Sequence, residues 1–215
     1  MLYFFIAVIF LFYFKPAGLE IRAMGLFDKF KKGQTVSVDD AAKALSGRIL
    51  KVSAGNAETV KKFYEEQTNG ELEIDAWKLW KIVFEFEFLF LHVSDRMSFD
   101  ILGQDRRSVF LDRLVELTVN STIDTAFPEL GSEERGNLKG SMLTDYNASQ
   151  YEYGQYRMFA NKKESTKDTV FWEFGKKVAE RIGQPMNILY ITLSMDLAIA
   201  SLEVLHLNSI LQSID

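Results

Sequence analysis

Apolar side chains recur every three or four positions through most of the chain beyond residue 37, which is the period of an α-helix. The strongest such pattern covers residues 71–102, with Trp77, Trp80, Phe84, Phe88 and Leu91 at helical spacing. Within it, residues 84–88 alternate apolar and acidic positions as a strand would. Because no turn residues separate this stretch from its flanks, we predict one long helix that is capped by Gly103.

The same pattern predicts more helices, whose ends are set by capping residues, glycine and proline. Residues 53–56 read as a break between two early helices, and residues 129–140 read as a loop. The predicted helices cover residues 37–52, 56–67, 71–102, 105–127, 141–162, 167–182 and 186–211. The expected fold class is therefore all-α, a single helical bundle-like domain of about six or seven helices with no strand.

A short apolar segment precedes this domain. Residues 1–14 are apolar throughout and would span about 21 Å as a helix, which is less than the roughly 30 Å of a bilayer core. Lys15 and Pro16 end the run, and no basic start or cleavage site marks a signal peptide. We interpret residues 1–23 as either an anchor or an extension before a true start at Met24.

Residues 24–36 form a basic amphipathic start and a linker, and residues 37–215 form the helical domain. Between residues 24 and 32 the apolar side chains Leu26, Phe27 and Phe30 alternate with three lysines at positions 29, 31 and 32. Such a segment is suited to contact with a membrane surface, although its short length makes that contact weak.

Composition excludes several classes of function. The 215 residues carry a net charge of −5 and contain no cysteine. A disulfide, a thiolate metal site and a cysteine nucleophile are therefore excluded. No basic excess favours nucleic acid as a partner. No phosphate-binding glycine loop, nucleophile elbow or His-Glu-x-x-His motif is present in the sequence.

The two histidines supply the main candidate chemistry. Glu85, His92 and Asp95 are spaced by seven and three residues, and Asp196, Glu203 and His206 repeat that spacing. Each trio would line one face of a helix. If the two helices pack together, carboxylates and imidazoles converge, and the candidate metal ligands are Glu85, His92, Asp95, Glu203 and His206. Iron, manganese or zinc would suit such ligands.

A structural interpretation of the same residues competes with the metal site. A dinuclear carboxylate site needs two Glu-x-x-His motifs and two further glutamates, whereas the chain has one such motif, at Glu203. Arg96 is placed to neutralise Asp95, and Lys81 is placed to pair with Glu85 one turn away. No cofactor is therefore predicted, and a metal-binding helical-bundle enzyme is the alternative function.

Three segments carry a resemblance. They are residues 90–96 (FLHVSDR), 102–107 (LGQDRR) and 170–177 (VFWEFGKK), and together they resemble small helical bacterial proteins of unknown function. The resemblance extends over residues 24–211. It implies a bacterial and cytoplasmic setting, and it implies no activity or site.

The leading expectation is a non-enzymatic interaction protein or a membrane-peripheral accessory protein. It would work through a protein partner or self-association, with membrane contact through residues 1–32 and no nucleic acid. The expected location is the cytoplasm, with attachment to the inner membrane if residues 1–23 act as an anchor.

Overall fold

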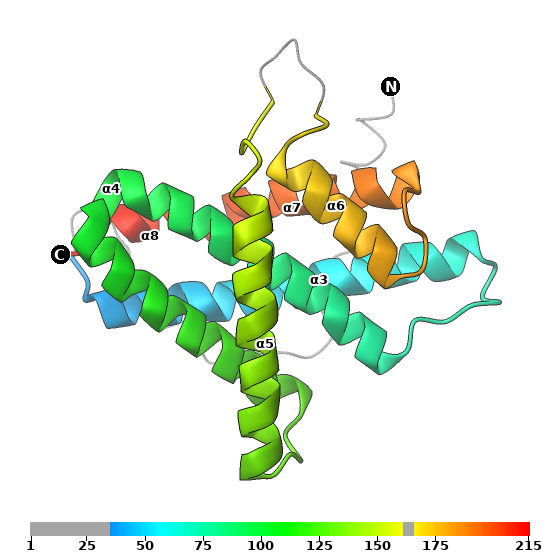
Figure 1. Cartoon of the computed structure of the whole chain (residues 1–215), viewed down its shortest axis with the longest axis horizontal. Coiled ribbons are helices and arrows are strands. Elements are labelled where there is room, and N and C mark those ends of the chain that lie inside the picture. Colours follow the sequence, from blue (N-terminus) through cyan, green and yellow to red (C-terminus); the bar gives the residue numbers. More distant parts are fainter. Residues whose placement is uncertain (1–34, 161–165) are drawn as a thin grey trace.

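The computed structural model describes residues 35–160 and 166–215 (Figure 1). Six helices occupy this part of the chain, and five of them have twelve residues or more. They are α3 (Val38–Gln67), α4 (Ala76–Ala126), α5 (Ser132–Tyr153), α6 (Val170–Arg181), α7 (Ile188–Leu205) and the short α8 (Leu207–Gln212). The all-α fold class is confirmed. The interpretations of residues 1–34 fall outside the described residues.

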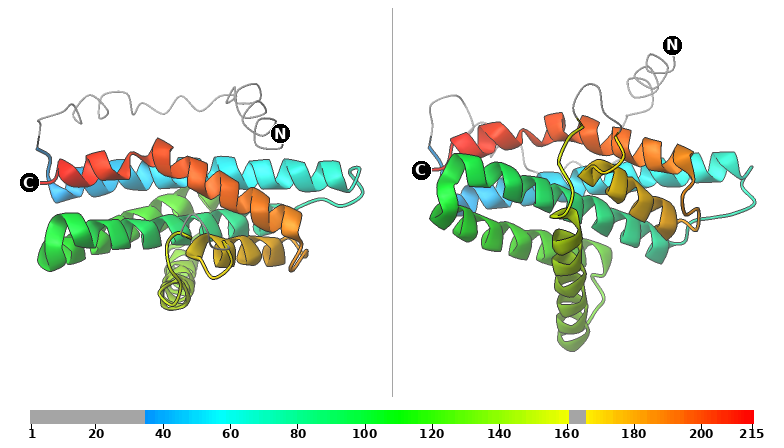
Figure 2. Two further views of the ribbon diagram at one scale, coloured as in Figure 1. Left: turned by 90° about the horizontal axis from the view of Figure 1, so that it is seen from above. Right: turned by 45° about the horizontal axis from the view of Figure 1, so that its top comes forward.

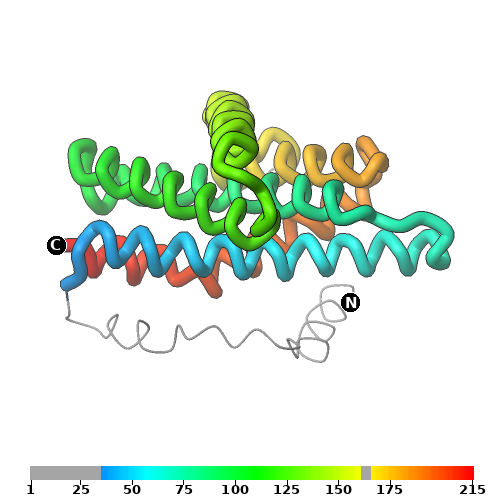
Figure 3. The backbone as a smooth tube through the Cα atoms, turned by 90° about the horizontal axis from the view of Figure 1, so that it is seen from below, coloured from blue at the N-terminus to red at the C-terminus, as the bar shows by residue number. Residues whose placement is uncertain are grey.

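The helices form two main layers. Helices α3, α7 and α8 lie side by side in one layer, and α4 lies in the other, against α3 and α8 (Figure 2). Helix α6 packs between α7 and α4. Helix α5 crosses α4 at a steep angle, since Figure 3 views α5 nearly end-on while α3 and α4 run across the picture. One end of α5 projects from the body (Figure 1). The part of α4 before Gly103, which we call its first arm, is therefore enclosed by α3, α5 and α6.

The core lies mainly between α3 and α4. Leu45 and Ile49 of α3 and Leu89 of α4 are completely buried. Phe86 of α4 meets Phe174 of α6 edge to face, with 4.8 Å between ring centroids. Each such side chain contributes roughly 1.5–3 kcal/mol when it leaves water. The apolar side chains between Ile82 and Val93 are thus at the centre of the fold, whereas Trp77, at the start of the predicted stripe, is 47% exposed.

Helix α3 is continuous, so the predicted break at residues 53–56 is wrong. Asn56, the first residue of the second predicted helix, lies mid-helix, where its Nδ2 donates a 2.9 Å hydrogen bond to Ser201 Oγ of α7. Ser53 and Ala57 beside it are fully buried. Small and polar residues occur here because another helix packs closely on them. Such residues are also typical of turns, which is why the sequence predicted a break.

Helix α4 bends sharply at Gly103, the residue predicted to cap the helix. Gly103 has φ 72° and ψ 174°, a conformation that disfavours any side chain. The two arms of α4 then run side by side, since Thr122 of the second arm contacts Glu87 of the first. The continuous 51-residue element and the unbroken α3 explain why five long helices replace the six or seven expected.

Three predicted helix ends are wrong for local reasons. Helix α5 begins at Ser132, inside the loop predicted over residues 129–140. Glu134 Oε2 accepts a hydrogen bond from Gly131 N, and this contact caps the start of the helix. It ends at Tyr153, so Gly154 lies after the helix and not inside it. Helix α6 begins at Val170, not at residue 167, because Asp168 has a positive φ of 66°.

The last predicted helix is divided. Met186 has φ 62°, which delays the start of α7 to Ile188. His206 takes the left-handed conformation, with φ 51° and ψ 36°, and ends α7 before α8 begins. Between α6 and α7 the backbones approach closely at Gly175, where an added Cβ would lie 2.6 Å from the carbonyl oxygen of Ile191.

Candidate functional site

A set of polar side chains lies where the first arm of α4 meets α5 and α6. Glu85 and His92 come from α4, two turns apart on one face as their spacing predicts. Their neighbours come from the other two helices. We call this set the polar seam, and it consists of Glu85, His92, Gln150, Tyr153, Lys177 and Arg181.

Glu85 is bound by Arg181. The Nε and Nη2 of Arg181 donate hydrogen bonds of 2.8 and 2.6 Å to the same oxygen, Oε1 of Glu85. The other oxygen, Oε2, is buried and has no protein partner. Burial raises the pKa of the Glu85 carboxyl, and the Arg181 guanidinium opposes that rise. The predicted pair between Glu85 and Lys81 is replaced by this contact from α6.

His92 is held in one orientation by Gln150. The side-chain Nε2 of Gln150 donates to the carbonyl oxygen of Phe88 at 3.1 Å, which turns its Oε1 toward His92 Nδ1 at 2.8 Å. His92 Nδ1 is thus the donor in this contact, and the buried Nε2 carries a lone pair without a partner. Burial lowers the pKa of His92, so the imidazole is neutral near pH 7.

Tyr153 completes the seam beneath His92. Its ring is fully buried and lies 5.6 Å from the His92 ring, edge to face. Lys177 Nζ stands 5.3 Å from the Tyr153 ring centroid and forms a 2.7 Å ion pair with Glu152. Burial raises the pKa of the Tyr153 hydroxyl, which has no hydrogen-bond partner in the described structure. The seam therefore packs three helices together.

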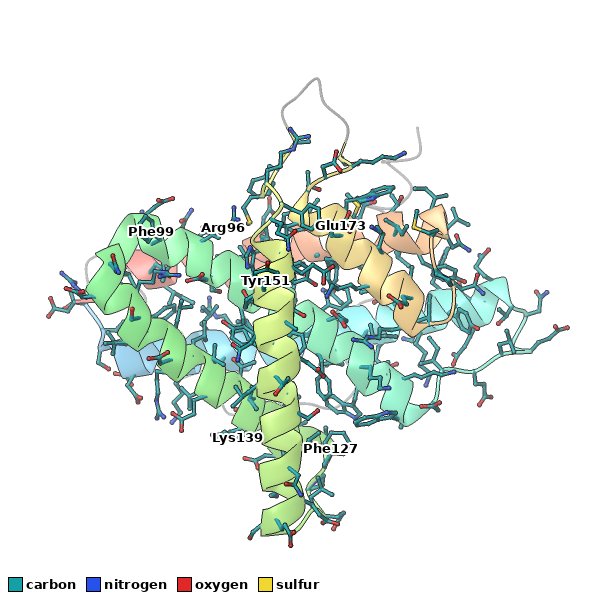
Figure 4. All side chains as sticks on the ribbon, in the orientation of Figure 1. Arg96, Phe99, Phe127, Lys139, Tyr151 and Glu173 are labelled. Carbon is teal, nitrogen blue, oxygen red and sulfur yellow. The ribbon has the colours of Figure 1, made fainter. Side chains whose placement is uncertain are left out.

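Asp95 lies beyond the seam and is neutralised by Arg107. Arg107 Nε and Nη2 lie 2.6 and 2.5 Å from Asp95 Oδ1. Arg96, which was expected to neutralise Asp95, instead donates to the carbonyl oxygens of Gly154 and Tyr156, each at 3.3 Å. Figure 4 shows Arg96 of α4 on one side of the C-terminal end of α5 and Glu173 of α6 on the other.

The second predicted trio lies on α7, away from the first. Helix α7 packs on α6 and α3 rather than on the Glu85 face of α4. Glu203 is exposed, and His206 is exposed at the left-handed turn after α7. Across residues 35–160 and 166–215, no three His, Asp or Glu side chains lie close enough to hold a metal ion. The structure does not bring together the candidate ligands Glu85, His92, Asp95, Glu203 and His206.

Sequence reasoning missed a buried carboxyl on the opposite side of α4. Glu87 is 1% exposed and faces the second arm, where its Oε1 lies 2.6 Å from Thr122 Oγ1. The same hydroxyl lies 2.9 Å from the carbonyl oxygen of Thr118. One hydroxyl has one proton, so a protonated Glu87 carboxyl satisfies both contacts. Burial raises the pKa of Glu87 to about 8, which agrees with this geometry.

A cleft of about 300 Å³ opens beside Glu85 between α4, α5 and α6. Its walls include Trp77, Phe84 and Asp145, together with the Glu85–Arg181 pair. The Nζ of Lys81, also in the wall, lies 5.3 Å from the centroid of the Trp77 ring. The Arg181 guanidinium in this wall is already bonded to Glu85.

The outward side of α7 is the largest departure from the expected burial pattern. Four large apolar side chains on it are exposed, namely Ile188 (54%), Leu189 (55%), Ile199 (42%) and Val204 (55%). Three polar residues run between them, and burial raises the pKa of one of these, Asp196. We define the α7 face as Ile188, Leu189, Thr192, Asp196, Ile199, Ala200, Glu203 and Val204.

The α7 face contributes to the high mean hydropathy of residues 188–212. Among the described residues, one helical stretch, Ile188–Gln212, is long and apolar enough to cross a membrane, with a mean hydropathy of 1.8. In that stretch, 44% of the most apolar window is buried inside the domain. The inner side of α7 supplies core residues such as Ile191 and Ala198.

Comparison of the chain with family models, with curated proteins and with solved structures finds no match. The case for function therefore depends on the polar seam and the α7 face.

Proposed function

We propose that this protein is a non-enzymatic interaction protein and that the α7 face is the surface through which it binds a protein partner. The observation that carries the proposal is the exposure of four large apolar side chains on one side of a single helix. Exposed apolar patches of this kind are typical of interaction sites. Covering the exposed half of each side chain would contribute roughly 1 kcal/mol.

The polar residues of the α7 face indicate the chemistry of the partner. Asp196 and Glu203 lie seven residues apart, about two helical turns, between the apolar side chains. A partner that buries these carboxylates must supply cations or hydrogen-bond donors, because an unpaired buried charge is costly. An amphipathic basic helix meets both requirements, with apolar anchors and lysine or arginine between them.

Position-specific photo-crosslinking tests the proposal. A photoreactive residue is placed at Leu189 or Ile199 of the full chain, in cells that express it. Val109 is the matched control, because it is 61% exposed and apolar but lies on α4. We expect one discrete protein adduct from both α7 positions and none from position 109, and we expect Asp196→Lys to abolish it. Equal adducts from all three positions, or none from α7, would contradict the proposal.

A membrane surface is the second candidate partner. It is favoured by the mean hydropathy of Ile188–Gln212 and by the lysines and aromatic residues between positions 24 and 32. Flotation with anionic phospholipid vesicles separates the two contributions. Loss of flotation on Leu189→Glu assigns lipid contact to the α7 face, whereas loss only on replacement of the three lysines assigns it to the N-terminal residues.

A further inference from the structure

The start of the described chain lies beside its end. The backbone N–H of Val36 donates a 2.8 Å hydrogen bond to the carbonyl oxygen of Ser213, and the N–H of Asp215 donates to the carbonyl oxygen of Val36 at 3.2 Å. The chain therefore enters the domain next to the end of α8. Figure 2 shows α8 and α7 following one another along the same side of the domain. Residues before Val36 are thus joined to the domain at the α8 end of this pair.

The distance from this entry point to the α7 face is short. Helix α8 has six residues, about 9 Å, and His206 joins it to the end of α7 near Glu203. Three residues between positions 32 and 36 extend over about 10 Å. Phe30 lies six residues before Val36, a span of about 20 Å for an extended chain, and Ile199 lies fourteen residues before Ser213, about 21 Å along α8 and α7. Asp196 and Glu203 are about 10 Å apart along α7.

The chemistry of residues 25–32 complements that of the α7 face. This segment has the sequence GLFDKFKK, with three large apolar side chains and three lysines. The α7 face has exposed apolar side chains on both sides of Asp196 and Glu203. The basic amphipathic element that the face requires in a partner is therefore present in the same chain, within reach of it.

We propose that residues 25–32 dock on the α7 face of their own domain, with their lysines at Asp196 and Glu203 and their apolar side chains against Ile199 and Val204. The proposal rests on the proposed function, since it treats the α7 face as an interaction surface, and it adds regulation. The segment competes with the external partner, so the partner binds only as the segment leaves.

The absence of cysteine from the chain allows a clean test in the purified full-length protein. Phe30→Cys is combined with Ile199→Cys, and disulfide formation is followed in dilute monomer. The matched control combines Phe30→Cys with Val109→Cys. Position 109 is a suitable control because it also lies near the entry point. Arg113, one turn from Val109, forms a 2.5 Å ion pair with Asp39. We expect the disulfide between positions 30 and 199 to form within one molecule at least tenfold faster than the control disulfide.

A charge exchange gives the test its specificity. Changing Lys29, Lys31 and Lys32 to Glu is expected to slow disulfide formation between positions 30 and 199 several-fold, and adding Asp196→Lys with Glu203→Lys is expected to restore it. Equal rates for both pairs, or a disulfide only between molecules, would overturn the proposal. Intermolecular product alone would show that a second copy covers the face.

Failure of residues 25–32 to dock can be distinguished from failure of the proposed function. If the disulfide fails to form but the partner photo-adduct from α7 persists, the face binds a partner without self-docking. If the disulfide forms and no partner adduct appears even in the triple lysine variant, the face serves as an internal packing surface and the proposed function fails.

Discussion

Arg181 Nε and Nη2 both donate hydrogen bonds to a single oxygen of Glu85, although the two residues are 96 positions apart. Glu85 is 1% exposed, while the side chain of Arg181 is 43% exposed. The guanidinium thus covers a buried carboxyl from the solvent side. The pair joins α6 to the first arm of α4.

Removal of Arg181 should leave the Glu85 carboxyl buried without a partner. We expect Arg181→Ala to lower the free energy of unfolding by about 1–3 kcal/mol at pH 7, below the 3–5 kcal/mol of a fully buried pair because Arg181 is partly exposed. At pH 5 the loss should be smaller, since the carboxyl, whose pKa is raised, protonates more readily. Urea unfolding at both pH values measures this. An equal loss at both would show that Arg181 acts only by packing.

Glu87 should make the stability of the fold depend on pH. Its pKa is about 8 in the fold against an ordinary value of 4.5, so the folded state holds a proton that the unfolded state releases. The contribution is fully present below pH 4.5 and is lost as pH rises through about 8, with a total on the order of 3–5 kcal/mol. Glu87→Gln should remove this loss and be more stable than the parent at pH 8.

The control for Glu87 is Glu58→Gln, a change at an exposed position of α3. Unfolding free energies from pH 4 to 9 are compared for the parent and both variants. If Glu87→Gln and Glu58→Gln follow the parent curve alike, the Glu87 carboxyl is not held protonated.

His92 should titrate below its ordinary range. Burial lowers the pKa of the imidazole, so the unfolded state binds a proton at higher pH than the folded state does. Stability therefore falls as pH drops below 6.5. In a His206→Gln variant, the remaining histidine signal can be followed by NMR. A midpoint at or above 6.5 would show that the ring is solvated or paired with a carboxylate.

Two glycines in helices should respond oppositely to alanine. Gly103 has a positive φ, so Gly103→Ala should cost about 1 kcal/mol or more by straining the bend of α4. Gly47 lies within α3 with open space around its Cα, so Gly47→Ala should stabilise by about 0.5–1 kcal/mol. Thermal unfolding of both variants tests the assignment of the bend, and a stabilising Gly103→Ala would contradict it.

The helical pattern of the sequence predicted the buried helix faces well and the helix boundaries poorly. Apolar periodicity over residues 71–102 correctly indicated a helix with a buried face, but the helix begins at Ala76 and not at residue 71. Gly103, which was predicted to cap it, is the point at which α4 bends. The break predicted at Asn56 failed because its amide bonds Ser201 of α7, a contact 145 positions away. Likewise, local spacing assigned Lys81 to Glu85, whereas tertiary packing supplies Arg181.

The candidate site was predicted in part. The spacing of Glu85 and His92 correctly placed both residues on one face of a helix, because a helix fixes that relationship locally. Their partners Gln150 and Arg181 come from other helices, and no local pattern identifies them. The left-handed conformation of His206 also separates it from the regular turn that the Glu203-x-x-His206 spacing assumed.

The most direct test of the account is the ratio of partner photo-adducts formed from Ile199 and from Val109 in the full chain. The two side chains are both apolar and exposed, at 42% and 61%, and they differ in the helix that carries them. If the α7 face is the working surface, the adduct from position 199 should exceed that from position 109 at least fivefold and should rise further when residues 29, 31 and 32 are changed to Glu. A ratio near one, unchanged by those substitutions, would contradict the account.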